Sequence, residues 1–326
     1  YNPVSVSGYH IREAGSTAAQ ELAFTLNNGF AYIEECLERG LKIDNFAHRL
    51  SFFFNAHMDF FEEIAKYRAA RRIWANRLKN RYGAKNESSL KLKFHTQTAG
   101  CSLTAQQPEN NIVRTAFEAM SAVLGGTNSL HTNSLDETLA LPSEKAAKIA
   151  LRTQQILAFE TGVPNVADPL GGSWYIEELT DKLEKQAMKY FEEIQEMGGT
   201  VQAIEDGYFQ KKIAESASIY QESIDSRDRI IVGVNDFVEE DEELDIEILK
   251  ISKDAQNTQE NKIKNLRKDR NDEILNKKMK KLSDACKKDL NLVPFLIEVA
   301  EAGGTVGEIV EIMKKVYGEW EESFGI

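Results

Sequence analysis

Three of the five histidines stand at corresponding places in the chain, each at the end of a short strand-like run. An imidazole titrates near neutral pH, so it can transfer a proton or donate a hydrogen bond to an oxygen that gains charge. Each histidine taken alone is also explained by a bond to a backbone carbonyl, but the repetition favours a shared functional face. The three are His10 after residues 4–8, His95 after residues 90–94, and His131 closing residues 129–131.

Other residues near these histidines could bind anions or metals. Arg49 carries a planar cationic fork that suits a phosphate, although it could equally pair with a carboxylate in the wall of the fold. His48 and His57 lie outside strand ends and are interpreted as structural. We expect no metal site, because no two histidines have the spacing of a helical metal-binding pair and there is no His-Cys cluster.

Four strand-then-helix units must position these side chains. Successive units of this kind predict parallel strands with right-handed crossovers, and hence an α/β fold. A (βα)8 TIM-type barrel needs about 250 residues, so these four units predict the second half of such a barrel, with the other half upstream or on another chain. The units pair residues 4–8 with 17–40, 49–54 with 58–82, 90–94 with 110–123, and 129–131 with 143–160.

We predict two regions, with residues 1–163 forming the four βα units and residues 164–326 a mostly helical extension. The acidic run at 239–243 is interpreted as a solvated loop. The extension is expected to hold a helix at 175–196, two short helices within 203–223 and a strand at 230–234. One nearly uninterrupted helix at 254–288 and closing helices at 294–302 and 305–319 follow.

Composition excludes several classes of protein. A net charge of -12 over 326 residues repels a nucleic acid backbone, and no apolar run approaches the roughly 20 residues of a membrane-spanning helix. Three widely separated cysteines fit reduced thiols in a cytoplasmic protein. Because the chain starts at Tyr1 without an initiator Met, we expect it to begin inside a longer or processed polypeptide.

Several short sequence motifs are more specific than these patterns of composition and periodicity. They run in order through nearly the whole chain, densely to about residue 175 and loosely after 234. Together they resemble the second half of the catalytic domain, in the large subunit, of methylmalonyl-CoA mutases. The strings are SGYHIREAG at 7–15, RLSFF at 49–53, HTQTAG at 95–100, GGTNSLHTNSLDE at 125–137, ADP at 167–169 and GGS at 171–173.

The resemblance implies an isomerase of propionate metabolism that rearranges the carbon skeleton of an acyl-CoA by radical chemistry, with adenosylcobalamin as cofactor. The best match is (R)-methylmalonyl-CoA to succinyl-CoA. In this family the residue matching Tyr9 lies beside the adenosyl group and substrate, and the one matching His10 hydrogen-bonds the migrating thioester carbonyl. A fixed donor aimed at an oxygen that gains charge stabilises a transition state.

Further roles follow from the same resemblance. Arg49 and Ser51 match coenzyme A contacts, and Gln97 matches a substrate-side amide. Phe53 falls among apolar residues that shield the radicals, although a core role explains it as well. The positions implied to lie against the corrin ring are Glu13, Gly100, Glu137 and Ala140.

The chain also departs from the family pattern. Cys101 stands where many members have a bulky aromatic residue, and Asn128 where they have glutamine. The Asp-x-His-x-x-Gly signature of the cobalt-ligating domain does not occur, and the substrate-selecting residues lie upstream in the family. The expected partners are therefore an upstream barrel half and a cobalamin-binding domain or subunit, within an oligomer.

Two alternatives stay open. A related mutase would act on isobutyryl-, ethylmalonyl- or 2-hydroxyisobutyryl-CoA. Alternatively, the chain has no activity of its own and serves as an assembly subunit or a degenerate remnant, because a half barrel exposes two unpaired strand edges.

Overall fold

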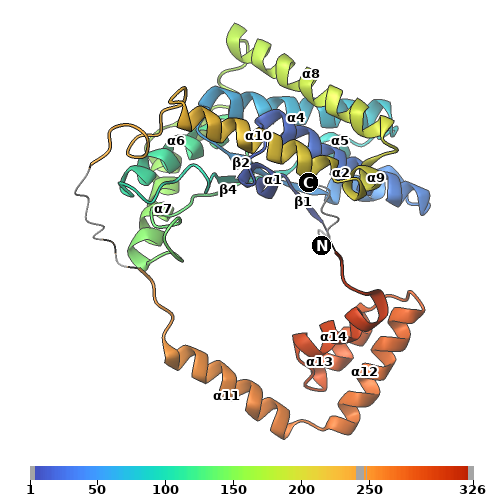
Figure 1. Cartoon of the computed structure of the whole chain (residues 1–326). Helices are drawn as coiled ribbons and strands as arrows, with labels where there is room; N and C mark the ends of the chain where they lie inside the picture. Colours follow the sequence, from blue (N-terminus) through green and yellow to red (C-terminus); the bar gives the residue numbers. More distant parts are fainter. Residues whose placement is uncertain (1–3, 240–245, 247, 322–326) are drawn as a thin grey trace. The chain divides into compact units, whose positions relative to one another are not determined.

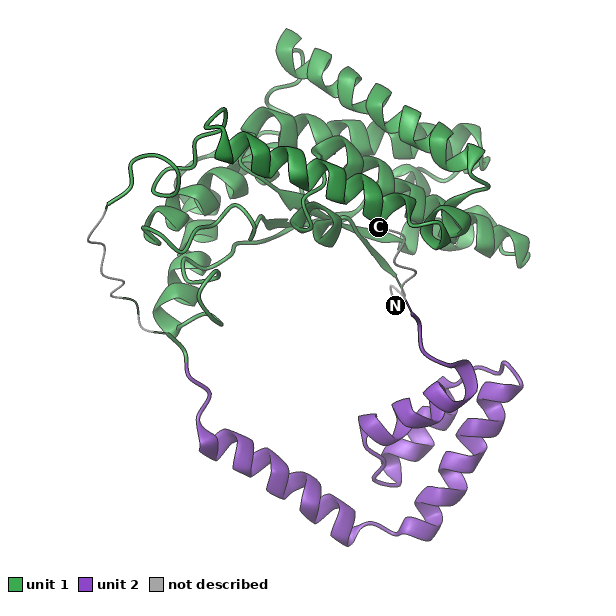
Figure 2. Cartoon of the chain, viewed as in Figure 1, with its two compact units in different colours: residues 1–249, 324–326 green, residues 250–323 purple. Residues whose placement is uncertain are grey.

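A computed structural model describes residues 4–239, 246 and 248–321. The chain divides into two compact units, one within residues 1–249 and the other within residues 250–323 (Figure 2). The larger unit contains every strand of the described chain. Each unit is described by itself.

The larger unit is built on a four-stranded sheet in which all neighbouring strands are parallel, in the order β1-β2-β3-β4. This confirms the predicted α/β class with parallel strands, and the arrangement is consistent with part of a barrel. In the described chain, β1 and β4 each pair on one side only. The strands are β1 Ser5–Ser7, β2 Ser51–Ala56, β3 Phe94–Thr98 and β4 Ser129–His131.

One face of the sheet is packed against helices. Residues at alternate positions, Phe52, Phe54 and Phe94 among them, are almost fully buried there, because successive side chains of a strand point to opposite faces. Phe52 packs edge-on against Trp74 of α4, and Phe54 against Phe94. The apolar core of the unit therefore lies between the sheet and its helices.

Helices cover this face in two layers. α2 and α4 contact each other, and α8 packs on both; Figure 1 shows α8 beyond α4 on the same side of the sheet. α2 begins at a capping box formed by Thr17 and Gln20, which satisfies orphan amides of its first turn. The helices of this unit are α1 Tyr9–Glu13, α2 Ala18–Glu38, α3 Ile43–Phe46, α4 Phe60–Asn80, α5 Glu87–Leu90, α6 Asn110–Leu124, α7 Glu144–Phe159, α8 Trp174–Glu196, α9 Thr200–Glu205 and α10 Tyr208–Asp225.

Two strand predictions are wrong in detail. Arg49 was placed on the second strand, but it lies in a 3-10 turn, Ala47–Arg49, just before β2. The third strand was predicted at 90–94, but Leu90 ends α5 and β3 begins at Phe94. The reason is pairing: Phe94 is the first residue of this stretch that lies opposite a β2 residue, Phe52.

The strand predicted at 230–234 is also wrong. This segment is a tight turn in which Val232 and Asp236 form one isolated bridge. The side-chain oxygen of Asn235 accepts from the amide of Ile231, and this bond closes the turn locally. By contrast, the two short helices predicted at 203–223 are confirmed as α9 and α10.

The smaller unit consists of helices around a compact apolar centre that includes Leu275, Leu282 and Val299. The helix predicted at 254–288 is broken at Arg270, whose guanidinium donates to Glu308 Oε1 at 2.7 Å and to the carbonyl of Gly303. Its helices are α11 Lys253–Asp269, α12 Asp272–Lys287, α13 Val293–Glu301 and α14 Val306–Tyr317.

Two remaining observations concern the chain as a whole. The predicted acidic loop at 239–243 lies almost entirely outside the described residues. Among the helices of the described chain, none combines the length and apolarity that crossing a bilayer requires.

Candidate functional site

The second face of the sheet, which we call the polar face, carries side chains that strand register arranges in three layers. Apart from Phe53 they are small or polar, whereas the inward layers of a closed barrel are usually bulky and branched. This face is therefore suited to contact a polar ligand rather than to pack as a core. The layers are Ser5 with Ser51; then Ser7, Phe53, His95 and Ser129; then Asn55, Gln97 and His131.

Serine hydroxyls orient two of the predicted histidines. His10 Nδ1 lies 2.7 Å from Ser7 Oγ, and His95 Nδ1 lies 2.7 Å from Ser129 Oγ. Burial lowers the pKa of His95, and the nearby His131 adds to this effect. These bonds fix each ring through Nδ1.

Tyr9 lies against the middle of this face. Its ring stacks on Phe53 with centroids 4.8 Å apart and an interplanar angle of 2°, and its hydroxyl accepts from Gln97 Nε2 at 2.9 Å. Burial raises the pKa of Tyr9, and the Glu13 and Glu137 carboxylates add to it, so the phenol stays protonated at neutral pH. The structure thus places the predicted site residue Tyr9 beside both His10, at a centroid distance of 5.5 Å, and Gln97.

Asn133 joins the same group although it was not among the predicted site residues. Its Oδ1 accepts from Gln97 Nε2 at 2.8 Å, and its Nδ2 donates to the Thr98 carbonyl at 3.0 Å. The amide is thereby fixed with its oxygen toward Gln97. The signal that could have found it is its position two residues after His131, at the carboxyl end of the fourth strand.

Glu13 holds the end of β3 in place. Its Oε1 accepts from Asn55 Nδ2 at 2.7 Å and from the Gly100 amide at 2.9 Å, and its Oε2 accepts from the Cys101 amide at 2.9 Å. Both oxygens are therefore engaged inside the chain. The carboxylate bridges α1, β2 and the loop that follows β3.

Three polar groups closely surround the Cα of Gly100. A Cβ built on it would lie 3.0 Å from Glu13 Oε2, 3.3 Å from Asn133 Nδ2 and 3.5 Å from the Tyr9 hydroxyl. We call these four residues the cradle. Any side chain at residue 100 would fill it, so glycine keeps it accessible to a ligand.

Glu137 lies close enough to Glu13 for the two carboxylates to interact electrostatically. Burial raises its pKa, and Asp136 and Glu13 contribute to the shift. Ala140 lies in the same turn, where its amide donates to the Asp136 carbonyl. The four residues predicted to face the corrin all follow the carboxyl ends of strands along the chain.

Arg49 and Ser51 lie at the opposite end of β2. Ser51 Oγ donates to the Val4 carbonyl at 3.1 Å, and Arg49 is exposed. With a rise of about 3.3 Å per residue, Ser51 lies about 13 Å along the strand from Asn55. The structure therefore separates these two residues from the cradle by the length of the polar face.

A buried ionic cluster binds the backbone of Asn55. The sequence analysis did not predict this cluster. Lys66 Nζ lies 2.5 Å from Glu21 Oε2, also pairs with Glu63, and donates to the Asn55 carbonyl at 2.8 Å. Glu21 Oε1 in turn accepts from the Asn55 amide at 2.7 Å. Mutual pairing is what makes such buried charges tolerable, and it anchors the residue that holds Glu13.

The two positions that depart from the family pattern also have clear environments. Asn128 Oδ1 accepts from the Phe94 amide at 2.8 Å, and so helps to begin β3. Cys101 is exposed beside the cradle. In the described part of the chain, no cluster of three or more His, Cys, Asp or Glu side chains could hold a metal ion.

Comparison with known proteins gives one consistent family. The family model described as methylmalonyl-CoA mutase matches residues 1–319. The 2-hydroxyisobutanoyl-CoA mutase large subunit of Aquincola tertiaricarbonis is 46% identical over 326 residues, which is 99% of this chain and 58% of that protein. The methylmalonyl-CoA mutase of Rhizobium meliloti is 46% identical over 322 residues, covering 98% of this chain and 45% of its own length.

The human mitochondrial methylmalonyl-CoA mutase is 46% identical over 321 residues, covering 98% of this chain and 43% of its own length. The chain therefore spans about half the length of the curated relatives that it matches. Identity alone does not separate the two named activities, because it is the same for each.

Proposed function

The chain belongs to the methylmalonyl-CoA mutase family, and we propose that it supplies the second half of a catalytic (βα)8 barrel to an adenosylcobalamin-dependent acyl-CoA mutase. The observation that carries this proposal is the polar face, which runs from Ser51 to the cradle along four parallel strands. A barrel with this lining would hold a ligand where other barrels hold a packed core.

The ligand would lie along β2. Its coenzyme A portion would meet Arg49 and Ser51, and its acyl group would reach Tyr9, His10 and Gln97 at the other end. The separation of about 13 Å between Ser51 and Asn55 supports this placement, because an extended pantetheine chain covers a distance of that order.

His10 would donate its ring N–H to the thioester carbonyl of the substrate. Ser7 fixes the ring through Nδ1, which leaves Nε2 for the substrate. A preorganised donor is worth most when the oxygen gains charge, so His10 would act chiefly in the transition state. Tyr9 and Phe53, stacked at 4.8 Å, would form an apolar plate that excludes water from the reacting carbons.

The cradle would hold the cofactor. When bound, adenosylcobalamin supplies the deoxyadenosyl radical that abstracts hydrogen from the substrate. Glu13, Gly100, Glu137 and Ala140 would lie against the corrin ring. Glu13 would act mainly by fixing the Gly100 and Cys101 backbone, because both of its oxygens already accept hydrogen bonds within the chain.

For the substrate we propose (R)-methylmalonyl-CoA, converted to succinyl-CoA. A second candidate is 2-hydroxyisobutyryl-CoA, which is favoured equally by the 46% identity to the large subunit of that mutase. Isobutyryl-CoA and ethylmalonyl-CoA are the two remaining candidate substrates. An upstream barrel half and a cobalamin-binding domain or subunit would supply the substrate selector and the cobalt ligand.

Reconstitution tests the proposal. The chain is mixed with an upstream barrel half and a cobalamin-binding domain from the same source, and isomerisation of the four acyl-CoAs is followed with and without adenosylcobalamin. We expect turnover that requires the cofactor, fastest with methylmalonyl-CoA. A stable complex without turnover on any substrate would instead support the reading that this chain is an assembly subunit, joined through the edges of β1 and β4.

A further inference from the structure

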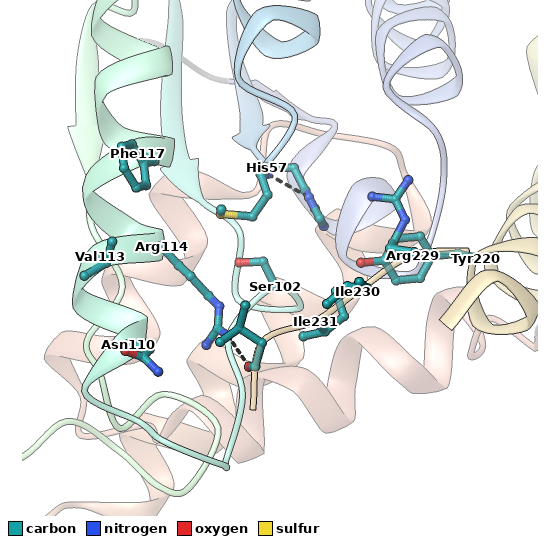
Figure 3. Close-up of a pocket in the computed structure, with 12 residues that line it drawn as sticks. His57, Ser102, Asn110, Val113, Arg114, Phe117, Tyr220, Arg229, Ile230 and Ile231 are labelled. Atoms are coloured by element: carbon teal, nitrogen blue, oxygen red, sulfur yellow. Dashed lines mark hydrogen bonds between the residues drawn. The ribbon is translucent and has the colours of Figure 1, made fainter. Parts of the chain in front are cut away.

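A cavity of about 340 Å³ lies beyond the carboxyl ends of β2 and β3 in the larger unit, and none of the residues of the polar face line it. It is enclosed by α6, by the loop that follows β2, and by the turn that follows α10 (Figure 3). Its volume is at the low end of the range for small-molecule sites, about 300–1,000 Å³. The cavity is therefore large enough for one small organic ligand.

Both long walls of the cavity are mostly apolar. One wall is the face of α6 that carries Val113 and Phe117, which lie one helical turn apart, together with Arg114. Val113 is 52% exposed and Phe117 54% exposed, which is costly for apolar side chains unless something covers them. Ile230 and Ile231 face them from the other side (Figure 3).

The charge in this cavity is positive and unbalanced. Arg114 and Arg229 line it, and the lining includes no Asp or Glu, in a chain with twelve more acidic than basic residues. Arg114 is 9% exposed and binds only neutral oxygens, those of Thr104, Asn111 and Val232. The nearby Glu118 is fully buried outside the cavity lining, where it accepts a hydrogen bond from the Ser102 hydroxyl at 2.6 Å, and burial raises its pKa well above the usual range.

Arg229 carries the one charge that is open to a ligand. Its guanidinium lies over the Tyr220 ring, 4.9 Å from the centroid, and it forms no ion pair in the part of the chain that the structure describes. Asp59 and Glu62 line a neighbouring cavity that shares Arg229, but neither is within ion-pair distance of it. A guanidinium pairs well with a carboxylate, and the apolar residues beside it favour a carboxylate with an apolar tail over inorganic phosphate.

His57 adds a neutral donor. Its Nδ1 accepts from the Met58 amide at 2.8 Å, so the neutral ring carries its proton on Nε2. Burial lowers the pKa of His57 well below its usual value, and the charges of Arg12, Lys66 and Arg229 add to this, so the ring is neutral at pH 7. Arg229 lies beside His57 in the cavity (Figure 3).

We propose that this cavity binds a small organic monocarboxylate with a short apolar tail. The carboxylate pairs with the Arg229 guanidinium, and the tail covers Val113, Phe117 and Ile231. Such a ligand supplies the missing negative charge and covers the exposed apolar wall at once. The site involves neither the cradle nor the acyl-CoA reaction, so it stands independently of the proposed mutase function.

Calorimetric titration of the full chain with hexanoate tests this site. We expect saturable binding with one molecule per chain, and no comparable binding of hexylamine or inorganic phosphate. Arg229→Gln should weaken hexanoate binding about tenfold or more, because a charge-assisted bond is lost. Arg152→Gln is the matched control, since Arg152 is an exposed arginine of α7 outside the cavity, and it should leave binding unchanged.

Val113→Glu provides a second test at a half-exposed position of α6, where a folded variant is expected. Its carboxylate would enter the cavity and should abolish hexanoate binding by repulsion. Near-ultraviolet circular dichroism checks that each variant is folded. The proposal is overturned if hexanoate does not saturate, if hexylamine or phosphate binds equally well, or if folded Arg229→Gln and Val113→Glu bind like the wild type.

Discussion

Glu13→Gln should weaken the support of the cradle by an amount that follows from three hydrogen bonds. The glutamine oxygen can still accept from Asn55 Nδ2 and the Gly100 amide, which lie 2.7 Å and 2.9 Å from Glu13 Oε1. Its NH2 group would then face the Cys101 amide, which is also a donor. One charge-assisted bond is lost, and two others become neutral bonds.

A hydrogen bond to a charged group contributes about 1.5–3 kcal/mol, and one between neutral groups about 1 kcal/mol. Water can reach the amide of the exposed Cys101 and offset part of the loss. We therefore expect Glu13→Gln to lower the free energy of local opening of this loop by about 2–3 kcal/mol. Such a change corresponds to roughly a 30- to 150-fold increase in amide exchange.

Hydrogen exchange of the Gly100 and Cys101 amides measures this directly and does not require the two units to unfold together. Glu35→Gln is the matched control: Glu35 pairs with Arg39 at 2.6 Å on the surface, with its side chain 56% exposed. A surface pair of this kind contributes less than about 1 kcal/mol. If exchange at Gly100 and Cys101 is the same in both variants and the wild type, Glu13 does not hold this loop.

Three further predictions concern charge, space and packing. Folding raises the pKa of Glu118 through burial, so the contribution of Glu118 to the free energy of unfolding is complete below about pH 4.5 and is lost as pH rises. Glu118→Gln should therefore become more stable relative to the wild type between pH 4.5 and 8, as measured by urea titration. A stability difference between the two proteins that does not change with pH would contradict this. Gly100→Ala, with its Cβ 3.0 Å from Glu13 Oε2, should weaken adenosylcobalamin binding to the assembled enzyme about tenfold. Gly307→Ala, whose Cβ meets no atom within 4 Å, is the control and should leave binding unchanged. If both variants bind the cofactor with the same affinity, the cradle is not the cofactor surface. Leu282→Ala, at a fully buried position, should destabilise the smaller unit by about 2–5 kcal/mol, measured as faster amide exchange in α12 and α13, and unchanged exchange would refute the assigned core.

The sequence predicted the parallel sheet because its signals are local. Alternation along a strand and helical periodicity after it depend on neighbouring residues alone. The start of β3 was missed because alternation continues on both sides of Phe94, and only pairing with Phe52 decides where the strand begins.

Features that depend on distant partners could not be predicted in this way. The break at Arg270 lies inside a continuous charged helical pattern, and Arg270 bonds there to Glu308, which lies 38 residues further on. Lys66 looks like a surface lysine until folding places Glu21 and Glu63 around it. The engagement of both Glu13 oxygens by Asn55 and the loop after β3 likewise appears only in three dimensions.

The most direct test of the proposed active site is the rate of isomerisation by the assembled enzyme carrying His10→Ala. Loss of an oriented donor that acts in the transition state should lower kcat about a hundredfold and change KM little. His48→Ala, which alters a histidine away from the polar face, should leave both constants near the wild-type values. An unchanged kcat for His10→Ala would contradict the role of the polar face in catalysis.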